Sequence, residues 1–117
     1  MNVREVLAKR DAFFGKVVTI EGFLVEKAPE NYLYLAPNDD SRDDVSNSIR
    51  VELSFSRNEL DDRLPCWVGT QYAHVDPATL TGVLQPSDDG IFPAAIADLT
   101  RFTAVQDDEE IDILSGD

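Results

Sequence analysis

Cysteine, histidine and long apolar runs are nearly absent from this chain of 117 residues. The single cysteine, Cys66, rules out an intramolecular disulfide bond, so a reducing compartment is the default expectation. No apolar run approaches the roughly 18 residues that a membrane-spanning helix needs. Residues 1–14 mix charged and apolar side chains throughout, unlike a signal peptide. We therefore expect a soluble, cytoplasmic protein.

Basic residues are scarce, with 10 Lys and Arg against 23 Asp and Glu and a net charge of −13. The imbalance is uneven along the chain. Residues 1–28 carry five basic and four acidic side chains, whereas residues 29–117 carry five basic and nineteen acidic ones. Such a charge repels phosphate backbones and anionic membranes and favours cationic partners, although solubility alone also accounts for it.

The length excludes a second independent core, because domains cluster near 100–150 residues. A hydrophobic fraction of 43% is enough for a folded globule. We expect one domain over residues 1–106, followed by a tail over residues 107–117. The tail segment carries six acidic residues and no basic one in QDDEEIDILSGD. The pattern predicts a frayed tail that is either only solubilising or a mimic of phosphates that binds a basic groove.

Apolar spacing predicts one amphipathic helix, five strands and a short second helix. Asn2 is placed to begin the first helix and Gly15 to end it, and Ser56 with Glu59 forms a capping-box pattern for the second. Residues 64–77 have no clear pattern. The predicted helices cover residues 3–14 and 56–64, and the strands cover residues 16–26, 30–36, 48–55, 78–86 and 91–105.

Two of these strands carry an interior glycine, Gly22 and Gly82, in similar surroundings (VTIEGFL and TLTGVL). An interior strand glycine marks a bulge, a sharp bend or a close approach of another backbone. In residues 30–36, Leu33 and Leu35 alternate with Tyr32 and Tyr34, so the leucines and the tyrosines are expected on opposite faces.

This order resembles the OB-fold, a five-stranded Greek-key barrel with a helix between strands three and four. SH3-like barrels share much of the same order. In OB-folds a glycine in strand one allows that strand to bend and serve both sheets. The segments that carry the resemblance are Gly15–Gly22, Tyr32–Leu35, Ile49–Phe55 and Thr79–Leu84. The fold class is therefore mainly β, a small OB-like barrel with an N-terminal helix and a short helix between strands three and four.

The resemblance implies a ligand face on strands two and three, where many OB-folds bind single-stranded nucleic acid or oligosaccharide. On this chain the face would hold Tyr32, Tyr34, Arg50, Glu52 and Ser54, with Phe23 as a further candidate. Two tyrosines suit base stacking, but one arginine against one glutamate departs from the basic rim of nucleic-acid-binding members. Simple cover of the barrel's outer surface, or burial under the C-terminal tail, is the alternative role of the tyrosines.

Other residues that bear reactive or binding groups have ordinary structural explanations. Four aspartates in residues 39–44 suit either a solvated loop or a weak divalent-cation site. Cys66 with His74 is a nucleophile pattern, but a buried, inert cysteine explains it as well. Trp67 and Tyr72 suit core packing or a partner anchor. The aspartates are Asp39, Asp40, Asp43 and Asp44.

The sequence thus predicts a binding module that is not an enzyme, with no cofactor and no metal. Its leading partner is a protein with a basic surface. Single-stranded nucleic acid bound through Tyr32 and Tyr34 is the second hypothesis. The candidate binding residues are Tyr32, Tyr34, Arg50, Glu52, Trp67 and Tyr72.

Overall fold

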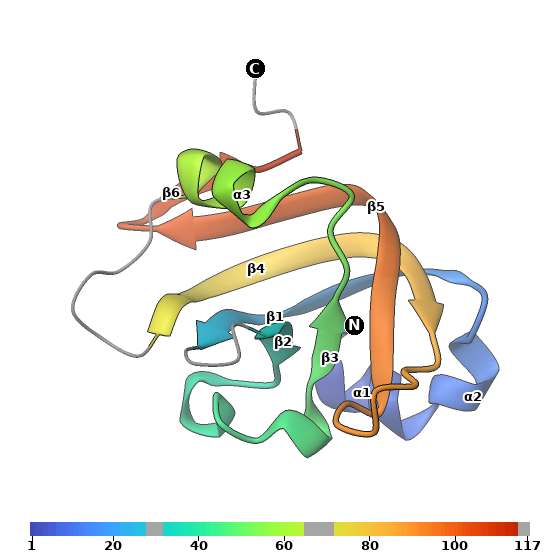
Figure 1. Cartoon of the computed structure of the whole chain (residues 1–117). Helices are drawn as coiled ribbons and strands as arrows, with labels where there is room; N and C mark the ends of the chain where they lie inside the picture. The colour runs from blue at the N-terminus through green and yellow to red at the C-terminus, as the bar shows by residue number, and fades with distance from the viewer. Residues whose placement is uncertain (28–31, 65–71, 115–117) are drawn as a thin grey trace.

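A computed structural model describes residues 1–27, 32–64 and 72–114 (Figure 1). Two short helices precede a run of strands, and a third helix separates β3 from β4. The helices are α1 (Val3–Ala8), α2 (Arg10–Phe13) and α3 (Arg57–Arg63), and two 3-10 turns, η1 (Asp39–Ser41) and η2 (Val45–Asn47), precede β3. The strands are β1 (Val17–Lys27), β2 (Tyr32–Ala36), β3 (Ile49–Val51), β4 (Tyr72–Gln85), β5 (Ala94–Gln106) and β6 (Glu109–Asp112).

Five of the strands close into a mixed barrel. The order along the sheet is β3-β2-β1-β4-β5-β6, and β3 also pairs with β5 in parallel through Ile49 and Ala94. All the other strand pairs are antiparallel. This five-stranded mixed barrel is compatible with an OB-like fold, and the predicted mainly β class is confirmed.

The interior of the barrel is the main hydrophobic core, and the alternation of strand residues decides which side chains enter it. Leu33 and Leu35 of β2 are buried in this core, whereas Tyr34 joins a second, smaller cluster on the other face of the strand. The predicted opposition of leucines and tyrosines is confirmed.

Both interior strand glycines lie where another backbone approaches closely. A β-carbon on Gly22 would stand 2.7 Å from the Ala36 carbonyl oxygen, and one on Gly82 would stand 2.5 Å from the Ala97 carbonyl oxygen. Real β-carbons do not tolerate such distances, so only glycine fits. Gly82 also lies at a register shift between β4 and β5. Of the bulge, sharp bend or close approach that the two strand patterns allowed, the structure shows a close approach at both glycines, with a register shift as well at Gly82.

The predicted first helix is split in two. Asn2 caps α1, as expected, and the structure adds a reciprocal capping box with Glu5. The helix is interrupted at Lys9, whose backbone leaves helical geometry, and α2 then ends before Gly15, at a φ of +82°. Val3, Val6 and Leu7 bury one side of α1 in the core.

The strand predictions hold with shifted ends. β3 covers only residues 49–51 of the predicted 48–55, whereas β4 begins at Tyr72, inside the segment without a clear pattern. Ser56 caps α3 by accepting a hydrogen bond from the Glu59 amide, as the capping-box spacing predicts. β5 begins at Ala94, directly after Pro93, which lacks the amide that a strand needs.

The prediction of a frayed acidic tail is wrong for the described part of that segment. Residues 109–112 form β6, which pairs with β5 beyond the predicted domain limit at residue 106. Ile113 is fully buried in the main core, and its amide donates to the Phe102 carbonyl oxygen at 2.8 Å. Arg63 of α3 donates to the Ile113 carbonyl oxygen at 2.8 Å. Apolar burial and backbone pairing therefore outweigh the repulsion among the acidic side chains.

Candidate binding face

The strands bring four of the predicted site residues together on one side of the barrel. Tyr32 and Tyr34 lie on β2, Arg50 lies on β3 directly opposite Tyr34, and Glu52 follows β3. Their exposure differs, however. The Tyr34 residue is 1% exposed, and Tyr32 is partly buried against the same cluster. Only part of the predicted stacking surface reaches solvent.

The small outer cluster explains why the tyrosines are withdrawn. The Phe92 ring contacts the Tyr34 ring with centroids 5.4 Å apart and the Tyr32 ring edge-on at 5.7 Å. The Tyr34 hydroxyl donates to the backbone carbonyl oxygen of Arg42. Residues 86–93 and 37–48 thus both close over the outer face of β2. Tyr34 is therefore buried, as one alternative from the sequence expected, but under Phe92 and the segment around Arg42 rather than under the tail.

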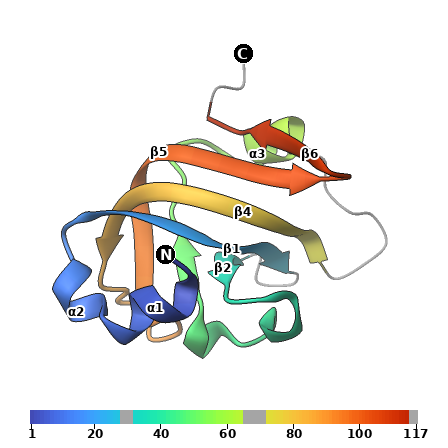
Figure 2. The same cartoon turned by 180° about the vertical axis from the view of Figure 1, so that it is seen from behind.

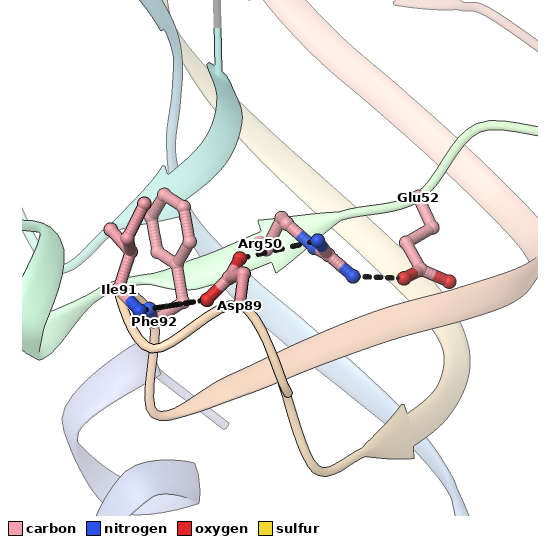
Figure 3. A network of polar contacts seen from close by, with 5 residues as sticks. All are labelled: Arg50, Glu52, Asp89, Ile91 and Phe92. Carbon is pink, nitrogen blue, oxygen red and sulfur yellow. Dashed lines mark hydrogen bonds and ion pairs between the residues drawn. The ribbon is translucent and has the colours of Figure 1, made fainter.

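Arg50 is tied to carboxylates on both sides (Figure 3). Its Nη2 donates to Glu52, and its Nη1 donates to Asp89 Oδ2 at 3.2 Å. The other Asp89 oxygen accepts the backbone amides of Ile91 and Phe92 at 2.8 and 3.1 Å. Asp89 therefore connects the arginine of β3 to the loop that carries Phe92.

The environment of Asp89 sets the charge of this network. Burial raises the pKa of its carboxyl group, but hydrogen bonds from Ile91 and Phe92 and the positive charge of Arg50 outweigh that effect. The pKa of Asp89 is consequently below its ordinary value, and the group is ionised at neutral pH. One guanidinium thus faces two carboxylates, Glu52 and Asp89.

The loop beside this face adds further negative charge. Asp40, Asp43 and Asp44 are exposed in residues 37–48, and Asp88 is exposed beside Asp89. Ser46 and Asn47 donate to Asp44, which lowers the pKa of its carboxyl group. Arg42 lies in the same segment, but the carboxylates outnumber Arg42 and Arg50, so the face around Arg50 and the segments beside it are acidic in sum.

The other candidate residues are not shown to lie on this face. Trp67 and Cys66 lie outside the described residues. Tyr72 is the first residue of β4 and pairs with Lys27, which also pairs with Tyr32, so strand register places Tyr72 two strands from Tyr32. His74 is the register partner of Glu26 on β1. Asp76 is buried and accepts a hydrogen bond from Gln106 at 3.1 Å.

Two residues of the face, Asp89 and Phe92, were not among the predicted site residues. The segment PSDDG predicts only a turn, and Phe92 follows it as part of an expected strand. An aspartate whose side chain accepts amides two and three residues later is a common turn device. That local signal predicts the turn, whereas the contact with Tyr34 depends on the barrel.

Within residues 1–27, 32–64 and 72–114, no group of three or more His, Cys, Asp and Glu side chains is placed to hold a metal ion. In the same part of the chain, no helix combines the length and apolar character needed to cross a membrane. Comparison with protein-family models and with curated proteins found no match.

Proposed function

We propose that this protein is a non-enzymatic binding module of the OB-fold superfamily whose partner is a protein with a basic surface. The strand order and the parallel closure of β3 on β5 support the superfamily proposal. The choice of partner rests on the surroundings of Arg50 and Tyr34. The arginine of the ligand face is held between two carboxylates, and the tyrosine opposite it is buried.

This arrangement disfavours single-stranded nucleic acid for two physical reasons. Stacking needs an exposed ring, and Tyr34 offers none. Binding of a phosphate backbone also gains from release of counterions at cationic groups. The Arg50 guanidinium is already neutralised by Glu52 and Asp89. Two carboxylates against one guanidinium leave an excess of negative charge, and this charge, with Asp88 beside it, attracts lysine and arginine side chains of a partner.

The test is a pair of NMR titrations of the isotope-labelled full chain at low and physiological salt. One ligand is a synthetic lysine- and arginine-rich peptide, and the other is a mixed-sequence single-stranded DNA of about thirty nucleotides, long enough to span an OB-fold site. We expect the peptide to shift the amides of Glu52, Asp88 and Asp89, and DNA to leave them unchanged.

A charge-reversed variant makes the test specific. Glu52→Lys should weaken peptide binding about tenfold, because one attractive charge becomes repulsive. Asp62→Lys, which makes the same charge change on an exposed residue of α3, should have little effect. DNA binding at micromolar affinity, centred on Tyr32, would replace this proposal with the nucleic-acid hypothesis.

A further inference from the structure

β6 is the last strand of the sheet, and its geometry leaves an edge. Among the described residues, no strand pairs with β6 on the side away from β5. The Ile113 amide donates to Phe102, and antiparallel register continues through Ile111 opposite Ala104. Because backbone groups alternate in direction along a strand, the amide and carbonyl of Glu110 are directed away from β5. Such groups are a template for an added strand.

Core packing and a contact from α3 fix the position of β6. Ile113 is fully buried, and Ile111 packs against the same core. Arg63 of α3 lies over the Phe55 ring, 4.8 Å from its centroid, and donates to the Ile113 carbonyl oxygen. A strand anchored in this way is already in the conformation that an added strand needs, which reduces the entropic cost of binding.

A shallow hollow of about 210 Å³ lies on the outer face of the same sheet, next to this edge. Glu21 of β1 and Glu110 of β6 border it on its two sides, and Arg101 is the one basic residue in its lining. Pro77 and Val105 give it an apolar wall, and Val105 is 37% exposed. Carboxylates beside apolar surface suit the aliphatic stem and charged head of a lysine or arginine side chain.

We propose that β6 is a docking edge for an extended, basic segment of a partner protein, which adds to the sheet as a further strand. Its backbone would bond to Glu110. One of its lysine or arginine side chains would pair with the Glu110 carboxylate across the strands, at the β6 border of the hollow. This proposal goes beyond the face around Arg50 and does not depend on it.

Charge identifies the occupant. β6 and the turn before it carry five acidic residues, so a second copy of this chain would place carboxylates opposite carboxylates, which destabilises cross-strand pairs. A basic segment reverses the sign of the same interaction. The acidic residues are Asp107, Asp108, Glu109, Glu110 and Asp112.

The experiment uses the full chain and a ten-residue peptide of alternating lysine and threonine. Two control peptides of the same sequence carry N-methyl groups on alternate backbone amides, one in each frame, so that they keep the charge but lose amide donors. We expect the unmodified peptide to shift the amide resonance of Glu110 and to slow its hydrogen exchange. At least one methylated peptide should bind about tenfold more weakly, because a strand is added through its backbone.

Two variants give the matched comparison. Glu110→Lys should weaken binding of the unmodified peptide about tenfold, since a cross-strand attraction becomes a repulsion. Asp11→Lys makes the same charge change on exposed α2, which lies at the opposite end of the molecule from β6 in both views (Figures 1 and 2), and should leave affinity unchanged.

Three results would overturn the proposal. These are the absence of peptide binding, equal binding of all three peptides, and binding that leaves the Glu110 amide unprotected. Shifts confined to Glu52 and Asp89 would support the proposed function while rejecting this edge. Shifts confined to β6 would support the edge and reject the face around Arg50.

Discussion

Gly22 of β1 lies so close to β2 that a β-carbon in its place would stand 2.7 Å from the carbonyl oxygen of Ala36. The same β-carbon would meet Leu35 and Val3 side chains at 2.9 Å, so the glycine is enclosed by β2 and α1 together. The helix and the first two strands can pack at this distance only because residue 22 has no side chain.

Gly22→Val is therefore expected to destabilise the fold by about 1–3 kcal/mol, through strain and displaced backbone. Gly82→Val should behave alike, because its β-carbon would meet Ala97. Chemical denaturation followed by circular dichroism measures both. Gly90→Asn is the control, because nothing lies within 4 Å of Gly90 and asparagine tolerates its φ of +75°. A Gly22→Val denaturation curve that matches the parent would contradict the close approach.

Ile113→Ala should destabilise the protein by about 2–5 kcal/mol, because a fully buried side chain is lost and a cavity is left. Val105→Ala, at a 37% exposed position on the neighbouring strand, should cost less than about 1 kcal/mol. Deleting residues 107–117 should likewise lower the melting temperature. An unchanged melting temperature after this deletion would instead support the hypothesis that residues 107–117 are a solubilising tail.

Asp89→Ala should destabilise the protein by about 1 kcal/mol, because the Ile91 and Phe92 amides lose their acceptor. Asp88→Ala, at the exposed neighbouring position, is the control. The effect depends on pH. The folded pKa of Asp89 is below its ordinary 3.8, so the stabilisation is complete above that value and is lost as the pH falls through the folded pKa. Denaturant titrations at neutral pH and below pH 4 measure it, and a difference that grows on acidification would contradict this assignment.

Tyr34→Phe should cost about 1 kcal/mol of stability, because the hydroxyl no longer donates to the Arg42 carbonyl oxygen. It should not change affinity for single-stranded DNA, which we expect to be weaker than micromolar at physiological salt. Fluorescence anisotropy with a labelled oligonucleotide measures affinity, and thermal melts measure stability. Tight DNA binding that is lost in this variant would give Tyr34 a ligand-binding role.

Features that depend on neighbouring residues along the chain were predictable. The helix caps at Asn2 and Ser56 follow from side chains that bond to amides three residues away. The inward leucines of β2 follow from strand alternation, and the role of Gly22 follows from its place inside an apolar strand.

Features that depend on distant parts of the chain were not predictable from the sequence. Phe92 covers Tyr34 only because the barrel brings residues 86–93 over β2. β6 was not predictable for the same reason. The alternation of polar and apolar residues in EEIDI is short, and its acidic residues are also typical of a solvated tail. Pairing with β5 decides the outcome there.

The parallel contact between β3 and β5 determines how the barrel folds and opens. It joins residues 49–51 to residues 94–96, so the chain must bring together segments far apart in sequence for only a short ladder. The loss of chain entropy on closing such a long loop comes before the gain from pairing, so we expect this seam to form late. Once formed, it should also be where the barrel opens most readily. The Glu52 amide donates to the Ile96 carbonyl oxygen of β5 at 2.9 Å, so its exchange would report that opening before the antiparallel strands exchange.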